Sequence, residues 1–326
     1  MDYLYQLQLL RESLPEFVTT FMLIVSHMAY YGGPVLMGMI FWGIDKKLGY
    51  DLVFTITASN LSCSVIKAGA QIQRPWFSDS RLHVAEAAAH SASGYSFPSG
   101  HSTFAMACYG TLSVAVKKAW FRILMLFMIV LTMFSRLFLG AHTIEDVAMG
   151  VTQSLVMMVL VYILLYFFRR HPELDWVALL GGLVICAAST LLIYLQTYTG
   201  DEIEIKKMFK DGMSAVGMFS GALIGWFVEK RFIRFENAFD MKGRILRIVG
   251  GLVAFALYFL VISEKIFGSL LDLDNSTAGE MGLGGFLQFF TTMLLALIII
   301  PAFIKMIQKK RLPTEPFLNE QRDFCH

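Results

Sequence analysis

Two histidines and three basic residues interrupt an otherwise very apolar sequence, and together they are suited to chemistry on a phosphoryl group. The basic residues are Lys67, Arg74 and Arg136, and the histidines are His101 and His142. Clustered Lys and Arg side chains bind a multiply charged oxyanion, and Arg offers two parallel donors to it. The set therefore predicts an anion-binding site.

The histidines predict catalysis in addition to binding. Asp146 follows His142 by four residues, so on a helix the two side chains share a face. A carboxylate beside an imidazole fixes the tautomer and stabilises the imidazolium. One neutral histidine can attack phosphorus while the other, protonated, donates a proton to the leaving oxygen. Such a pair predicts a bell-shaped pH profile in the neutral-to-acidic range.

The stretch "PSGH" at residues 98–101 opens an apolar helix with polar residues. Ser99 is typical of a helix N-cap, Gly100 allows close backbone approach, and exposed N–H groups at a helix start favour an anion. No carboxylate cluster suited to Mg²⁺ or a two-metal site stands nearby in the sequence. We therefore expect no metal or other cofactor, with fixed cations neutralising the transition-state charge.

The composition indicates a membrane protein. The chain has 326 residues, of which 56% are hydrophobic and 16% charged, whereas soluble domains carry about 25% charged residues. The formal net charge of +2 argues against a nucleic-acid partner. Four scattered cysteines lack the spacing of a metal site or a disulfide framework. The expected surroundings are membrane lipids, and the oligomeric state stays open.

Apolar segments long enough to cross a bilayer recur along the chain, and they predict an all-α, polytopic bundle. We expect nine spans, near residues 27–45, 49–69, 102–117, 120–139, 146–168, 175–196, 212–229, 246–264 and 286–307. Eight spans with one re-entrant piece are the alternative. Gly32-Gly33-Pro34 interrupts the first span, and residues 15–26 are a candidate for a separate half-buried helix.

The distribution of positive charge predicts the orientation. Most of the 27 Lys and Arg residues fall in alternate loops and the C-terminal tail, so these segments are expected in the cytoplasm. Helix rise then places Lys67, His101 and Arg136 about 30, 24 and 21 Å above the inner face. All three approach the outer headgroup level, where ionisable residues are costly and usually functional.

Three blocks of sequence resemble the signature of the type 2 phosphatidic acid phosphatase superfamily. They are "KAGAQIQRP" at residues 67–75, "PSGH" at 98–101 and "SRLFLGAHTIED" at 135–146. The resemblance is specific over residues 67–146 and softer over 27–168. It implies a helical bundle with an extracytoplasmic site and no required metal.

The resemblance also implies a role for each matching residue. His142 would be the nucleophile that forms a phosphohistidine, Asp146 would orient it, and His101 would act as the acid. The residues that would hold the phosphoryl group are Lys67, Arg74, Ser99, Gly100 and Arg136.

The second half of the chain is longer than in compact bacterial members of this family, which stop near six helices. Glucose-6-phosphatase-like and sphingosine-1-phosphate phosphatase-like relatives are similarly long. We expect an interfacial segment at 1–26, a six-helix phosphatase core at 27–170, additional helices at 171–312 and a cytoplasmic tail at 313–326. This extension bears on the substrate class more than on the reaction.

Within the extension, Gly217, Gly221 and Gly225 lie on one helical face and predict close helix packing. The outer loops at 199–212 and 272–282 are expected to be solvated connectors, and lining or gating of the entrance is the alternative.

The leading hypothesis is a phosphatase of the cell membrane that removes phosphate or diphosphate from a lipid at the extracytoplasmic face. The alternatives are hydrolysis of a small phosphate ester such as a sugar phosphate, phosphotransfer to a lipid or sugar acceptor, and a phosphate or lipid transporter without turnover. A vanadate-haloperoxidase-like function would use a similar oxyanion pocket, but the membrane setting disfavours it.

Overall fold

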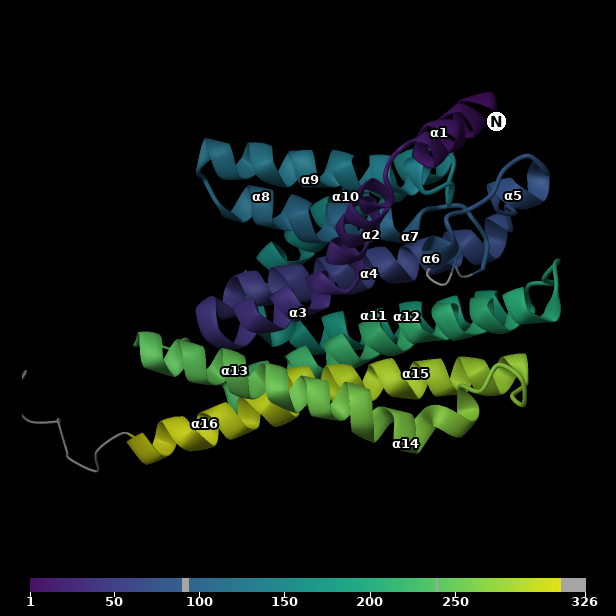
Figure 1. Ribbon diagram of the computed structural model, residues 1–326. Helices are drawn as coiled ribbons and strands as arrows, with labels where there is room; N and C mark the ends of the chain where they lie inside the picture. The colour runs from purple at the N-terminus through teal and green to yellow at the C-terminus, as the bar shows by residue number, and fades with distance from the viewer. Residues whose placement is uncertain (90–93, 239, 312–326) are drawn as a thin grey trace, which may run out of the picture.

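The structure is a computed structural model that describes residues 1–89, 94–238 and 240–311, and every regular element in these ranges is helical (Figure 1). The long helices run side by side, as an all-α polytopic bundle requires. The predicted tail at 313–326 lies outside the described residues.

Seven helical segments are long and apolar enough to cross a membrane, judged by length and composition. The main helices of these segments are α4 (Lys46–Ala70), α9 (Ala119–Phe138), α10 (Ile144–Arg170), α11 (Asp175–Leu195), α12 (Glu202–Val228), α13 (Met241–Leu257) and α15 (Ala278–Leu294). A bent helix pair near the N-terminus makes an eighth candidate. Among the described residues seven or eight segments pass this test, compared with the nine spans, or eight with a re-entrant piece, that the sequence predicts.

The bent pair consists of α2 (Glu16–Tyr30) and α3 (Gly32–Met39), which meet at an angle of 45°. Pro34 lacks a backbone N–H and its ring clashes with the carbonyl of Tyr30, so one straight helix is excluded. The break therefore falls where the sequence predicts it. The helix before the break begins earlier than the expected span, and α2 packs against α9.

The expected span at 102–117 is not among these candidates, because its helical run is too short to pass the length test. It forms α7 (Gly100–Ala105), a π-helical turn η2 (Met106–Gly110) and α8 (Thr111–Ala115). This run is about 24 Å long at the α-helical rise, which is shorter than the hydrocarbon core. It lies along α9, with which α7, η2 and α8 are all in contact.

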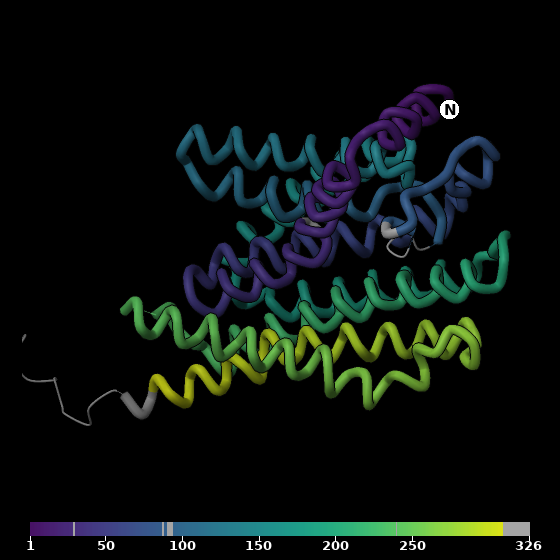
Figure 2. Tube along the Cα trace, in the orientation of Figure 1, coloured from purple at the N-terminus to yellow at the C-terminus, as the bar shows by residue number. Residues whose placement is uncertain are grey.

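The C-terminal extension is built around the pair α12 and α15, which follow each other over most of their lengths (Figure 2). A Cβ atom at Gly217 would lie 2.3 Å from the Phe286 carbonyl oxygen, and one at Gly221 would lie 2.8 Å from the Phe290 carbonyl oxygen. The backbones therefore touch along this seam, and the packing role predicted for the glycines is confirmed.

Other helical segments complete the extension. They are the π-turn η4 (Glu229–Ile233), η5 (Tyr258–Ile262), α14 (Ser263–Phe267), η6 (Gly268–Leu270), η7 (Leu295–Ile299) and α16 (Ile300–Arg311). α13 presents exposed apolar side chains such as Leu246, Val253 and Leu257. A surface of this composition suits contact with lipid tails and not with water.

Candidate active site

The ionisable residues singled out in the sequence gather at one end of the bundle, called the site end here. Lys67 lies in the last turn of α4, and Arg136 lies in the last turn of α9. His101 lies in the first turn of α7, and His142 lies just before α10. Arg74 immediately precedes the short helix α5 (Pro75–Ser78). Because helices end or begin here, their polar termini and these side chains share one level.

His142 is held between a cation and a carboxylate. Its Nε2 lies 3.0 Å from Arg74 Nη1, and its Nδ1 lies 3.5 Å from Asp146 Oδ2. A guanidinium can only donate, so Nε2 must carry the lone pair and Nδ1 the proton. This tautomer directs a nucleophilic nitrogen toward Arg74 and places the carboxylate behind the ring.

Asp146 is itself fixed by the start of α10. Its Oδ2 accepts from the backbone N–H of Thr143 at 2.8 Å, and the Thr143 hydroxyl in turn accepts from the Asp146 N–H, which closes a capping box. The hydroxyl of Ser96 also donates to Oδ2 and lies 3.4 Å from His142 Nδ1. The sequence spacing indicated the histidine–aspartate pair but not Ser96.

Lys67 and Arg74 are anchored by neutral backbone oxygens. Lys67 Nζ donates to the Tyr95 carbonyl at 2.7 Å, and Arg74 Nε donates to the Gly94 carbonyl at 2.9 Å. Arg74 Nη1 also donates to the Ala141 carbonyl at 3.0 Å. The carbonyl oxygen at Lys67 orients this cation without cancelling its charge, so the charge remains effective toward an anion.

Arg136 is the most deeply buried cation of the site, with no exposed surface. Its Nη1 donates to the Ser26 hydroxyl at 2.7 Å, whereas Nε and Nη2 have no hydrogen-bond partner among the described residues. Unsatisfied buried donors on a charged group are expensive. Two such donors on one guanidinium indicate a site made for an oxyanion.

His101 is also incompletely satisfied. It is 3% exposed, its ring stacks on Tyr30 at 4.6 Å between centroids, and its Nε2 has no partner in the part of the chain that the structure describes. The ring is thus held by stacking while one nitrogen stays available for proton transfer.

Within the "PSGH" stretch, Ser99 and Gly100 have different structural roles. The Ser99 hydroxyl caps α7 by accepting from the Ser102 N–H at 3.4 Å, and the Ser99 N–H donates to the Asp146 carbonyl at 2.9 Å. Ser99 therefore ties α7 to α10. A Cβ at Gly100 would meet no atom within 4 Å, so the glycine leaves open space beside His101.

One large cavity brings most of these groups together. Its volume is about 1240 Å³, and its lining includes Lys67, Arg74, Gly100, His101 and His142. The described lining does not include Ser99 or Arg136, which lie behind the surface.

The helix α2 supplies neighbours that the sequence analysis missed. Ser26 bonds Arg136, Tyr30 stacks on His101, and the buried His27 Nε2 has no partner among described residues. The signal that points to them is the polar and aromatic run "SHMAYY" directly before the Gly-Gly-Pro break.

The electrostatic state of His142 follows from its surroundings. Burial and then the positive charges of Arg74, Arg136 and Lys67 lower the pKa of His142 well below its usual value. The neutral imidazole thus persists to lower pH than in a free histidine. Within the described residues, no group of three or more His, Cys, Asp or Glu side chains is arranged to hold a metal ion.

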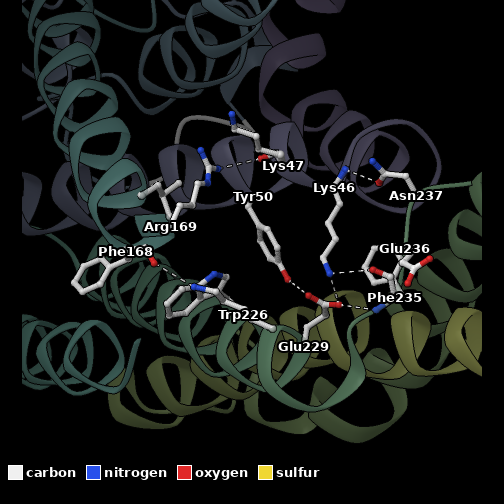
Figure 3. A pocket seen from close by; sticks show the side chains of 12 residues that line it. Lys46, Lys47, Tyr50, Phe168, Arg169, Trp226, Glu229, Phe235, Glu236 and Asn237 are labelled. Atoms are coloured by element: carbon white, nitrogen blue, oxygen red, sulfur yellow. Dashed lines mark hydrogen bonds and ion pairs between the residues drawn. The ribbon is translucent and has the colours of Figure 1, made fainter. Parts of the chain in front are cut away.

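A second charged cluster occupies the opposite end of the bundle, where a pocket of about 390 Å³ lies between α4, α10 and η4 (Figure 3). Lys46 Nζ lies 2.6 Å from Glu229 Oε1, and Lys230 Nζ lies 2.7 Å from Asp175 Oδ1. Glu229 also accepts from the Tyr50 hydroxyl. These cations are neutralised by carboxylates, so this cluster holds helices together.

The helical bundle defines an integral-membrane protein, and its site end holds buried cations beside a paired histidine and carboxylate. Residues 48–170 match the PAP2 superfamily, and residues 213–311 match the transmembrane extension of PAP2 superfamily phosphatases. The chain belongs to the PAP2 superfamily and carries this extension, which confirms the resemblance of the three sequence blocks. Every predicted site residue falls within the first match. No solved structure matches the chain.

Proposed function

We propose that this membrane phosphatase hydrolyses the phosphate of a lipid through a phosphohistidine on His142. The observation that carries the proposal is the placement of His142, with Nε2 beside Arg74 and Nδ1 toward Asp146. Binding alone needs no oriented nucleophile, so this geometry favours turnover over transport.

In the first step the phosphoryl group binds in the cavity beside Lys67 and Arg74, with Arg136 behind the cavity surface. The neutral Nε2 of His142 attacks phosphorus while protonated His101 donates its proton to the leaving oxygen. The bond from phosphorus to the ester oxygen breaks, and the lipid alcohol leaves. The three cations stabilise charge on the equatorial oxygens.

In the second step water attacks the phosphohistidine. His101, now neutral, takes a proton from that water, and the bond between phosphorus and Nε2 breaks. Inorganic phosphate is released, His142 returns to its neutral form and His101 to its protonated form. The Nδ1 proton stays with the ring throughout, held toward Asp146.

Two features support a lipid as the substrate. The cavity volume of about 1240 Å³ exceeds the range of about 300–1,000 Å³ that is typical for small-molecule pockets. The site also lies at the ends of apolar, membrane-long helices, where a lipid headgroup resides. A sugar phosphate needs neither feature.

We also propose that the site end faces away from the cytoplasm, in the cell membrane. The support is the basic opposite end, which carries Lys46, Lys47, Arg169 and Lys230. Glu145, exposed at the site end, and Glu173, exposed at the opposite end, allow a test by cysteine substitution. A membrane-impermeant maleimide should label Glu145→Cys in intact cells and Glu173→Cys only after permeabilisation, and the reverse pattern would invert the topology.

The activity test uses purified protein in detergent with EDTA. Phosphate release should occur from phosphatidate, phosphatidylglycerophosphate, polyprenyl diphosphate or sphingoid phosphates at matched concentrations. His142→Ala should abolish release, and the matched control His171→Ala, an exposed histidine beside Glu173 at the opposite end, should not. Preference for a sugar phosphate, or full activity of His142→Ala, would refute the proposal.

A further inference from the structure

The cavity extends well past the catalytic residues and lies between parts of the phosphatase core and the extension, which also pack directly on each other through α4 and α12. On the core side it is lined by residues of α2, α3, α4 and α7, and on the other side by residues of α12, α13 and α15. We call this space the chamber. Its walls thus come from both family-matched regions.

The depth of the chamber can be measured along its helices. On α12 the lining runs from Lys207 to Met218, and on α15 it runs from Met281 to Met293. These stretches correspond to about 16 and 18 Å at the α-helical rise. Half of a hydrocarbon core of about 30 Å is about 15 Å, so the chamber is as deep as one leaflet.

The character of the lining changes with depth. At the site end α12 contributes Lys207, Lys210 and Asp211, whereas deeper it contributes Met218. On α15, Gln288 donates to the Ser263 hydroxyl at 3.3 Å and Thr292 donates to the Gln288 carbonyl at 2.6 Å, so these polar groups are bonded within the protein. Asn60 and Ser214 add polar groups to the lining, whereas Met218, Phe289 and Met293 make the deep end apolar. A charged mouth above an apolar deep end matches an amphiphile with its head at the histidines.

Tyr31 and Val35, at the bend between α2 and α3, line the chamber and are 58% and 38% exposed. The chamber is therefore least covered at this bend. We expect a molecule from the surrounding leaflet to enter here.

We propose that the chamber holds the hydrocarbon chain of the substrate, so that α12, α13 and α15 select the lipid by its chain. The inference rests on the proposed function and deepens it, because it assigns the extension a role in specificity. Each buried methylene adds to the affinity, so the length of the chamber sets which chains bind best.

Two variants with opposite effects test this role. Met218→Trp adds bulk at the deep end of the chamber, and Phe289→Ala widens it from α15. Val253→Trp is the matched control, because Val253 is an exposed residue of α13 that does not line the chamber. The readout is kcat/KM for phosphatidates with chains of increasing length and for the soluble ester p-nitrophenyl phosphate.

Met218→Trp should lower kcat/KM for long chains by about tenfold or more, with little change for short chains or the soluble ester. Phe289→Ala should shift the optimum toward longer or bulkier chains, and Val253→Trp should leave the profile unchanged. An unchanged chain-length profile in both chamber variants would overturn the inference while lipid hydrolysis by the wild type stands. Absence of lipid hydrolysis by the wild type would instead overturn the proposed function.

Discussion

The two ends of the bundle contain similar numbers of buried or half-buried cations but use them differently. At the opposite end, Lys46 and Lys230 each meet a carboxylate within 3 Å. At the site end, Lys67 and Arg136 meet only a carbonyl and a hydroxyl, and no carboxylate among the described residues forms an ion pair with either. The first arrangement is complete without a ligand, and the second needs an anion.

This difference has an energetic consequence. Removing one partner of a buried ion pair leaves an uncompensated charge and is strongly destabilising. Removing a buried cation that has no charged partner relieves a desolvation cost. Equivalent substitutions at the two ends should therefore separate stability from activity.

The largest difference is expected for two buried aspartates at the starts of helices, Asp146 on α10 and Asp175 on α11. Asp146→Asn should lower kcat by about 10⁴-fold, because the amide no longer holds His142 in its nucleophilic tautomer. Asp175→Asn should keep kcat and lower the thermal stability, because Lys230 loses its partner. Phosphate release and thermal unfolding in detergent measure both effects, and equal loss of kcat in the two variants would contradict the comparison.

The next prediction compares two substitutions, one at the site end that should reduce activity and one at the opposite end that should reduce stability. Arg136→Met should reduce kcat/KM by about 10²–10³-fold and leave the melting temperature unchanged or higher, because an unpaired buried charge is removed. Glu229→Gln should lower the free energy of unfolding by about 3–5 kcal/mol with kcat retained. Glu236→Gln, an exposed carboxylate near Lys305, is the control and should change neither quantity. A clear stability loss in Arg136→Met would show that this cation is structural.

Binding of an anion should also distinguish the cations at the site end from those at the opposite end. Inorganic phosphate or vanadate at about 100 times its Kd should stabilise the wild type by about 2.7 kcal/mol, because an anion bound only to the folded state shifts the equilibrium. The variant Lys67→Gln should lose most of this stabilisation, and Lys47→Gln at the opposite end should retain it. Equal stabilisation of both variants would place the anion elsewhere.

The smallest expected effect concerns pH. Because burial and three cations lower the pKa of His142, the acidic limb of kcat/KM should lie below the ordinary histidine pKa of about 6.5. In Lys67→Gln one positive charge is gone, so the pKa of His142 should rise and the limb should move to higher pH by less than about one unit. A shift to lower pH, or the same shift in Lys47→Gln, would disagree with this assignment.

Much of the site could be predicted from sequence because helix geometry is regular. A fixed rise per residue places Lys67, His101 and Arg136 at a common level once the spans are known. The four-residue spacing also predicts that His142 and Asp146 meet, but His142 lies just before α10, so the contact is made across the helix N-cap and not along a helical face. These inferences use only distances along the chain.

Contacts between distant segments could not be obtained in this way. Nothing in the sequence indicates that Ser26 and Tyr30 of α2 lie against Arg136 and His101, since the lateral order of helices depends on packing between distant segments. The glycines of α12 predicted a packing face but not α15 as its partner. The number of candidate spans is lower than the nine predicted because the helical run at 100–115, which leads from the site end to the start of α9, is apolar but short.

The glycine seam between α12 and α15 limits how substrates can enter. At Gly217 and Gly221 no side chain separates the two backbones, so we expect these helices to move together. We therefore expect the chamber to widen for a bulky substrate on its other side, where α2 and α3 meet at their 45° bend. Stiffening that bend would slow admission and release while leaving the chemical step untouched.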